Sequence, residues 1–403
     1  MAQILIVADD LSGAVDSGVA CAVQGLNTVV VLDEAASDAD ADVLALDANT
    51  RAMTPDEAAA RTARVVRAWA RGDRQILFKK FDSTLRGHIG VEIAAALQTW
   101  RSAAHRNSAT VVAAPAFPAT GRTTIGGQQW LDGVRLEPDL PCTLEAAGLR
   151  TGCIGLEMVR SGQLPALLQT NAAGYAALVC DAETDADLRL IAESAASLRD
   201  GAVWAGCAGL ARCLPAALDL PRRGSRPVVT PSRKGPVLVV VGSLAGLSRK
   251  QAAVLSKRSD IAVVTLRPQG LLAGPGTQEW RGGQSRIVGA LSAGRDVLTV
   301  LGAEVRLDDD MAPRLANALA CLLGPCWQVI GGLVLTGGET ARAVLGEAGV
   351  RVLVPVHELE PGVPLALAST AYSQRLPVIT KAGAFGDSNT LVRCRDALRN
   401  LLR

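Results

Sequence analysis

The sequence predicts an α/β protein of two lobes, each a mostly parallel sheet flanked by helices, with a ligand cleft between the lobes. Short, continuously apolar runs alternate with alanine-rich helical patterns, as expected for parallel strands that are covered on both faces. The alternation stops in a segment with four prolines, residues 221–236, and restarts after it. A chain of 403 residues is also long enough for two or three domains.

The first lobe is expected to span residues 1–220. Its predicted strands are Ile4–Ala8, Thr28–Leu32, Val43–Leu46, Gln75–Phe78 and Thr110–Ala113. Two helices are predicted between these strands, at Pro55–Ala70 and Gly90–Trp100. Thr54 is the expected cap of the first helix, because Pro55 suits a first helical turn, where its missing N–H is not needed.

Residues 221–236 are predicted to be a linker, since their prolines suit neither a helix nor a central strand. The second lobe is expected to span residues 237–403. Its predicted strands are Val237–Val241, Ile261–Leu266, Asp296–Leu301, Gly332–Leu335, Arg351–Val356 and Pro377–Thr380. A closing helix is predicted at Asp387–Leu402.

Composition and charge exclude several classes of protein. The chain has 41 basic and 39 acidic residues, a net charge of +2, and 3% aromatic residues, which argues against a nucleic-acid partner. No run of 18 apolar residues occurs, so no membrane span is expected. The nine cysteines are scattered and never spaced as CxxC, and the first residues do not resemble a signal peptide. We therefore expect a cytoplasmic protein that binds a small molecule; the sequence is also compatible with a homo-oligomer.

Carboxylates follow the first predicted strand directly. Asp9 and Asp10 stand where a parallel sheet presents its ligand-binding edge. A carboxylate there can hold a substrate hydroxyl, accept its proton, or bind Mg²⁺ through water. The alternative is structural, because Asp10 could equally cap the helix that follows.

A second polar cluster follows the strand Gln75–Phe78 and contains Lys80, Asp82, Ser83, Thr84 and Arg86. Burying such a set without partners would be costly. The cluster is interpreted as a clamp for an anion, with basic groups for a carboxylate or phosphate and hydroxyls for the rest of the ligand. A structural salt-bridge network is the alternative. Arg51, after the third strand, lies at the same predicted edge and favours an anionic substrate.

Three glycine-bearing loops follow strands of the second lobe. They contain Gly242-Ser243, the segment 336–340 and the segment 381–387. Glycines at such turns let backbone N–H groups approach phosphate oxygens, which favours a nucleotide site. Neither GxxxxGK[ST] nor a clean GxGxxG occurs, so a P-loop enzyme is excluded and a dinucleotide site is disfavoured.

These motifs closely resemble those of the four-carbon acid sugar kinases. The resemblance rests on the segments 6–16, 79–87 and 115–122, and on the three glycine loops, which occur in the family's order. It implies a sugar-acid-binding domain followed by an ATP-binding domain. It also implies phosphorylation of a terminal hydroxyl of threonate, erythronate or an oxo-tetronate.

Carried over by motif, the substrate contacts implied by the resemblance are Asp10, Arg51, Asp82, Ser83, Thr84 and Leu85. The implied ATP contacts are Ser243, Gly337, Gly338, Glu339, Thr340 and Gly383. Three further substrate contacts are predicted from their positions directly after predicted strands: Asp9, Lys80 and Arg86. ATP is expected to arrive with Mg²⁺, and the metal ligands are left open.

Phosphoryl transfer depends on positioning and charge neutralisation, and a carboxylate must accept the hydroxyl proton. We favour Asp10 for this role over Asp82 and Asp9. Two other classes stay open from the residues alone. One is a nicotinamide-dependent sugar-acid oxidoreductase, and the other is a sugar-acid-binding protein without catalytic activity.

Overall fold

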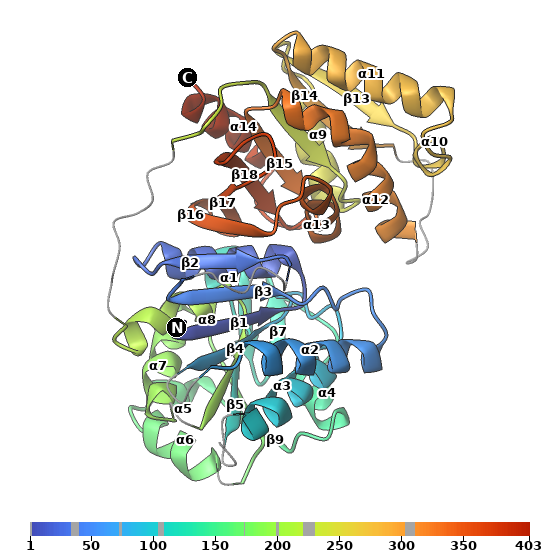
Figure 1. Cartoon of the computed structure of the whole chain (residues 1–403). Coiled ribbons are helices and arrows are strands. Elements are labelled where there is room, and N and C mark those ends of the chain that lie inside the picture. The colour runs from blue at the N-terminus through green and yellow to red at the C-terminus, as the bar shows by residue number, and fades with distance from the viewer. Residues whose placement is uncertain are drawn as a thin grey trace. The chain divides into compact units, whose positions relative to one another are not determined.

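The computed structural model describes residues 2–33, 40–71, 75–103, 109–172, 174–198, 201–220, 230–302 and 311–403. The chain divides into two compact units (Figure 1). The first unit comprises Met1–Val30 and Asp38–Arg226, and the second comprises Val31–Ser37 and Pro227–Arg403. Of the predicted linker, residues 221–229 lie outside the described residues, and residues 230–236 form neither helix nor strand.

The first unit is built on a twisted sheet whose strand order is β2-β3-β1-β4-β11-β5-β10-β9. From β3 to β9, every pair of neighbouring strands is parallel. The strands are β1 Ile4–Ala8, β2 Thr28–Val31, β3 Val43–Asp47, β4 Ile76–Lys80, β5 Thr110–Ala114, β9 Thr151–Ile154, β10 Ala177–Cys180 and β11 Ala202–Gly206. All five predicted strands are present; β9, β10 and β11 were not predicted.

Helices connect these strands. They are α1 Leu11–Ala22, α2 Pro55–Trp69, α3 Ile89–Ala103, α4 Leu140–Ala146, α5 Leu156–Arg160, α6 Leu164–Ala172, α7 Asp185–Ala195 and α8 Ala208–Ala217. From β1 the chain crosses toward β2, and from β3 it crosses back over β1 to β4. Right-handed crossovers in opposite directions place α1 and α2 on opposite faces of the sheet, where α1 packs on α8 and α2 packs on α3.

Local signals explain where α2 begins. The Thr54 side chain accepts a hydrogen bond from the backbone N–H of Glu57, and the Glu57 carboxylate accepts one from the backbone N–H of Thr54. This capping box, followed by Pro55 in the first turn, confirms the predicted start.

A small antiparallel sheet in the first unit was not predicted. It contains β6 Arg122–Ile125, β7 Gln128–Leu131 and β8 Val134–Arg135, in the order β6-β7-β8. A short 3₁₀ turn, η1 Pro118–Thr120, precedes it, and another, η2 Ala196–Leu198, follows α7.

The second unit has a sheet in the order β13-β14-β12-β15-β18-β17-β16. Its strands are β12 Val237–Val241, β13 Ile261–Leu266, β14 Asp296–Leu301, β15 Gly332–Thr336, β16 Val352–Glu360, β17 Val363–Ala368 and β18 Leu376–Lys381. The strands from β13 to β18 in this order are parallel, whereas β17 runs antiparallel to both of its neighbours. The predicted α/β class with two mostly parallel sheets is confirmed.

Helices also cover the second sheet. They are α9 Gly246–Leu255, α10 Pro268–Leu272, α11 Gln278–Ser292, α12 Met311–Leu323, α13 Gly338–Glu347 and α14 Thr390–Leu401, with a 3₁₀ segment η3 Gly324–Gln328. β12 is fully buried between the layers, as its five consecutive aliphatic residues predict. In the described part of the chain, no helix combines the length and hydropathy needed to cross a membrane.

Candidate active site

Strand register brings the predicted substrate residues to one edge of the first sheet. Ala8, the last residue of β1, pairs with Asp47 at the end of β3 and with Lys80 at the end of β4. The loops that follow these three strands therefore begin side by side. These loops carry Asp9, Arg51 and Asp82, although the residues are far apart in the sequence.

Arg51 joins the two carboxylates that follow β1. Its Nε and Nη2 atoms donate to Asp9 Oδ2 at 3.0 and 2.6 Å, and its Nη1 atom donates to Asp10 Oδ2 at 2.7 Å. The Arg51 side chain is 21% exposed, whereas both aspartates are nearly buried. Planar guanidinium groups suit such paired contacts, so this edge carries a fixed arginine–carboxylate cluster before any ligand binds.

Asp10 is also the N-cap of α1, which is the structural alternative that the sequence left open. Its Oδ1 atom accepts a hydrogen bond of 2.8 Å from the backbone N–H of Gly13. Burial and the charge of Asp9 raise the pKa of Asp10, and Arg51 and Lys80 only partly offset this rise. Capping and proton transfer are compatible roles, because a carboxylate has about four lone-pair positions.

Asp9 differs from Asp10 in its second oxygen. Asp9 Oδ1 is buried and has no hydrogen-bond partner among the described residues. An orphaned buried acceptor is costly. It is also the kind of atom that a bound water, hydroxyl or cation would satisfy.

The loop after β4 closes around Asp82. Asp82 Oδ2 accepts hydrogen bonds from Thr84 Oγ1 at 2.6 Å and from Arg86 Nε at 2.5 Å. Burial alone would raise the pKa of Asp82, but the charge of Arg51 and the contacts with Arg86 and Thr84 hold it well below its usual range. Asp82 is therefore an ionised anchor that organises the loop.

Backbone conformation in the same loop is unusual. Leu85 has a φ of 61° and Gly87 a φ of 91°. A left-handed leucine is strained, and such strain collects at functional sites. Leu85 is buried, and so is the neighbouring Ser83, whose Oγ atom has no hydrogen-bond partner among the described residues.

The two lysines at the end of β4 have different roles, because successive strand residues point to opposite faces. Lys79 Nζ forms a fully buried ion pair of 2.7 Å with Glu92 of α3. Lys80 Nζ donates to the carbonyl of Phe81 at 2.8 Å, and an added Cβ on Gly13 would lie 2.9 Å from this nitrogen. Lys80 therefore lies beside the start of α1, close to Asp10.

The pKa of Lys80 reflects this acidic surrounding. Burial lowers the pKa, but Cys207, Asp9, Asp10 and other acidic groups raise it by more. Lys80 is therefore a buried cation of the cluster.

Two residues of the unpredicted small sheet also belong to this region. Gln129 is buried, and its Nε2 atom donates to the carbonyl of Pro115 at 3.0 Å and, at 3.5 Å, to that of Ser83. Arg122 Nη1 donates to the carbonyl of Thr120 at 2.7 Å. Burial lowers the pKa of Arg122, against the opposing charges of Asp82 and other neighbours. Arg122 ends the segment 115–122 that carries part of the family resemblance, whereas Gln129 has no sequence signal.

In the second unit, the glycine loops follow β12, β15 and β18, which are adjacent in the sheet. An added Cβ on Gly383 would lie 2.1 Å from Ser243 Oγ, and one on Gly337 would lie 3.4 Å from Ser243 Cβ. Likewise, a Cβ on Gly242 would lie 2.0 Å from Thr340 Oγ1. The loop after β12 is therefore in contact with the loops after β15 and β18, and a side chain at any of these glycines would disturb that contact.

The start of α13 faces this junction. Gly337 has a φ of 91° and is the N-cap of α13, with no side chain capping the helix. Gly338, Glu339 and Thr340 form the first turn of the helix. Uncapped N–H groups at a helix start can bind phosphate oxygens, and they lie next to Ser243.

Comparison with known proteins matches both units. A family model described as a sugar-binding N-terminal domain matches residues 4–214, and one described as a nucleotide-binding C-terminal domain matches residues 238–391. The chain is 42% identical to a D-threonate kinase of Cupriavidus necator, with 96% of each chain covered. It is 32% identical to a D-threonate kinase of Salmonella typhimurium, with 96% of each covered, and 31% identical to a D-erythronate kinase of Heliobacterium modesticaldum, with 99% and 97% covered.

A solved structure from Salmonella typhimurium has the same fold, with a TM-score of 0.76 and 22% identity over 98% of this chain and 99% of the other. The kinase relatives and the nucleotide-binding unit together indicate a phosphotransferase that acts on a hydroxyl of a sugar acid. The chain belongs to the four-carbon acid sugar kinase family. The family, fold and enzyme class predicted from the sequence are thereby confirmed, and the roles of single site residues stay predictions.

Proposed function

We propose that this protein transfers the γ-phosphoryl group of ATP to the terminal hydroxyl of D-threonate. The relatives at 42% and 32% identity named above are D-threonate kinases, whereas 3-oxo-tetronate kinases reach 29%. The preformed cluster of Asp9, Asp10, Arg51 and Asp82 is the observation that carries the proposal. It offers fixed charges and hydrogen-bonding groups to a small hydroxylated anion.

Arg86 is our candidate for the substrate carboxylate. Its side chain is 58% exposed, and only its Nε atom is committed, to Asp82 and to Thr84. The two terminal nitrogens have no partner among the described residues and can form a paired contact with a carboxylate. Arg51, in contrast, is held by Asp9 and Asp10, so its proposed role is to fix those carboxylates and contribute its remaining donors.

The substrate hydroxyls are assigned to the loop after β4 and to the start of α1. The proposed hydroxyl contacts are Thr84 and Ser83, whose Oγ atom has no hydrogen-bond partner in the described part of the chain. Lys80 Nζ has three donors, of which one is bonded to the carbonyl of Phe81, and it is proposed to stabilise negative charge on the attacking oxygen.

Asp10 is the proposed acceptor of the hydroxyl proton. Its raised pKa makes it a better base than Asp82, whose pKa is strongly lowered. Asp9 is the more buried of the two neighbouring aspartates and is proposed to anchor Arg51.

ATP is assigned to the junction of Ser243, the first turn of α13 and Gly383. The arrangement supplies backbone N–H groups at an uncapped helix start and no bulky side chain. Mg²⁺ commonly binds one or two carboxylates together with substrate phosphates. Glu339, in the first turn of α13, fits that requirement, and Mg²⁺ bound there would neutralise phosphate charge.

We also propose a cytoplasmic enzyme with a small-molecule substrate and no nucleic-acid partner. All nine cysteines lie in the described residues and are free thiols. Burial raises the pKa of several of them, including Cys21 and Cys180, to about 12. Free thiols, most of them shielded from solvent, suit a reducing compartment.

The test is ADP release from ATP with D-threonate, L-threonate, D-erythronate and 3-oxo-tetronate as acceptors. We expect the highest kcat/KM with D-threonate and no reduction of NAD⁺ with any acid. A protein that binds D-threonate but releases no ADP would instead be a binding protein, and the proposal would fail. A higher kcat/KM with another acid would support the proposed kinase activity but contradict D-threonate as the preferred substrate.

A further inference from the structure

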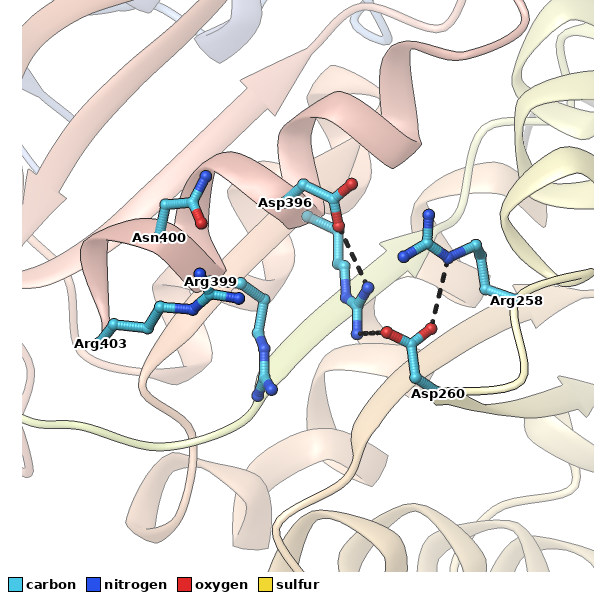
Figure 2. A pocket seen from close by; sticks show the side chains of 7 residues that line it. Arg258, Asp260, Asp396, Arg399, Asn400 and Arg403 are labelled. Carbon is cyan, nitrogen blue, oxygen red and sulfur yellow. Dashed lines mark hydrogen bonds and ion pairs between the residues drawn. The ribbon is translucent and has the colours of Figure 1, made fainter.

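A polar cavity lies entirely within the second unit (Figure 2). Its volume is about 290 Å³, and it is lined by the loop that precedes β13 and by the second half of α14. Ile261, which begins β13, pairs with Asp296, which begins β14. The cavity therefore lies at the amino ends of the strands, whereas the proposed nucleotide loops follow the carboxyl ends. The cavity and the proposed nucleotide site therefore lie at opposite ends of the strands of one sheet.

The floor of the cavity is a fixed network of charges around Arg395. This side chain is 4% exposed and pairs with Asp296 at 2.6 Å, Asp260 at 2.7 Å and Asp396 at 3.1 Å. Asp296 also accepts a hydrogen bond of 2.9 Å from the backbone N–H of Val237. Three carboxylates thus make their short contacts with one arginine, and the network holds α14 against the strand ends.

The other arginines of the cavity are much less engaged. Arg258 and Arg399 are 46% and 43% exposed, and each makes one ion-pair contact of 3.4 Å, to Asp260 and Asp296 respectively. No ion pair of Arg403 occurs among the described residues, and its side chain reaches the same cavity. Three guanidinium groups therefore keep most of their donors for a ligand.

The lining also limits the class of ligand. Every lining side chain is charged or an amide, and none is aromatic or aliphatic, so a nucleobase would find nothing to stack on. Arginine forks match phosphate and carboxylate groups. Asp260, Asp396 and the amide of Asn400 can bind hydroxyls. A cavity of about 290 Å³ suits a molecule of a few carbons.

We propose that this cavity binds a small phosphorylated hydroxy acid, with the phosphate on Arg258, Arg399 and Arg403 and the hydroxyls on the carboxylates and Asn400. The product of the proposed reaction belongs to this class of ligand, and only that link rests on the proposed function. Binding at the cavity itself does not depend on it.

The experiment is calorimetric titration of the full-length protein with 3-phosphoglycerate, with saturating ADP and Mg²⁺ to occupy the nucleotide loops. The test variant is Arg258→Gln/Arg399→Gln. The control is Arg286→Gln, an exposed arginine of α11 whose Nε atom makes only a 3.4 Å contact within its own helix. Each lost charge-assisted contact should raise Kd about tenfold or more, and therefore about 100-fold for the double variant. The control should stay within twofold of wild type.

A double variant that binds 3-phosphoglycerate within threefold of wild type would overturn the site. Equal affinity for inorganic phosphate and 3-phosphoglycerate would overturn the assignment to a hydroxy acid. Turnover with D-threonate, measured in parallel, separates this inference from the proposed function. The double variant should retain wild-type kcat because the cavity holds no proposed catalytic group. A wild type that binds 3-phosphoglycerate at this cavity but does not phosphorylate D-threonate would refute only the proposed function.

Discussion

Asp10 and Asp139 allow a matched test of the proposed proton acceptor. Both cap a helix in the same way, Asp10 through the N–H of Gly13 at 2.8 Å and Asp139 through the N–H of Cys142 at 2.9 Å. Asparagine is as good a cap as aspartate, so replacement by asparagine keeps both caps and removes one negative charge. The two asparagine variants should differ because the two carboxylate charges have different effects on stability and on turnover.

The pKa shifts of the two caps have opposite directions. Burial raises the pKa of Asp10, so its ionised form opposes folding above that pKa, and stability is regained as the pH falls through it. Burial raises the pKa of Asp139, but hydrogen bonds from Cys142 and Gln128 lower it by more, so its charge stabilises the fold at neutral pH and this contribution is lost in acid. At pH 7, Asp10→Asn should therefore be as stable as wild type or more stable, whereas Asp139→Asn should be slightly less stable.

Turnover should distinguish the two asparagine variants in the opposite sense from stability. Removing a general base costs about 10²–10⁴-fold in turnover, so Asp10→Asn should lose that much while Asp139→Asn retains wild-type kcat. Asp10→Ala, which also removes the cap, should lose an additional 0.5–2 kcal/mol of stability, or about 1–8 °C in Tm. The assays are ADP release and thermal unfolding for the three variants. If Asp10→Asn keeps kcat within tenfold of wild type, Asp10 is a structural cap and the base lies elsewhere.

Three further predictions test other parts of the site. Arg86→Lys keeps the charge but loses paired geometry, so KM for D-threonate should rise about tenfold with ATP KM unchanged; an unchanged acceptor KM would make Arg86 structural. In Gly383→Ala the new Cβ would lie 2.1 Å from the Ser243 hydroxyl and displace it, so the KM for ATP should rise about tenfold. The control, Gly346→Ala in α13, has open space around the new Cβ and should keep the wild-type KM. Equal KM values for the two variants would contradict the placement of ATP. Burial lowers the pKa of Lys381 to about 8, so the stability of wild type relative to Lys381→Met should rise as the pH increases from 7 to 9. In denaturant titrations the rise should be at most about 1.4 kcal/mol per pH unit. A stability difference that stays constant over this range would mean that Lys381 does not titrate there.

The strands that the sequence predicted are those with uninterrupted aliphatic runs, such as β1 and β12. Of the missed strands, β10 has such a run, ALVC, and could have been predicted, whereas β9 and β11 have an interrupted one. β9 is TGCI and β11 is AVWAG, so glycine and polar residues hide them. The β6–β7 hairpin turns at Gly126-Gly127 and has four-residue strands of mixed polarity, which a scan for buried strands passes over. Strand β17 was missed because it follows directly on β16 through the tight turn at Gly362.

For the site, sequence was informative about which loops meet and less so about which atoms pair. Parallel strands end at one edge, so the proximity of Asp9, Arg51 and Asp82 followed from the fold class. That Arg51 binds Asp9 and Asp10 depends on side-chain geometry across two strands, which no local pattern encodes. The different roles of Lys79 and Lys80 follow from strand alternation alone, so sequence could have separated them. Gln129 could not be found, because its role arises only after the small sheet has formed.

The bridge that Arg51 makes between Asp9 and Asp10 has a consequence for how substitutions there add up. Because Arg51 donates hydrogen bonds to both aspartates, removing Arg51 leaves two neighbouring carboxylates without it, whereas removing either aspartate leaves Arg51 paired with the other. The loss of stability caused by replacing Arg51 should therefore be smaller when Asp9 has already been replaced. A double-mutant cycle on Asp9 and Arg51 should give a coupling energy well above the value of about 0.5 kcal/mol that independent sites show. A substitution of Arg51 is thus expected to be better tolerated together with a substitution of Asp9 than alone, so these two positions should change together when the enzyme is evolved toward another acid.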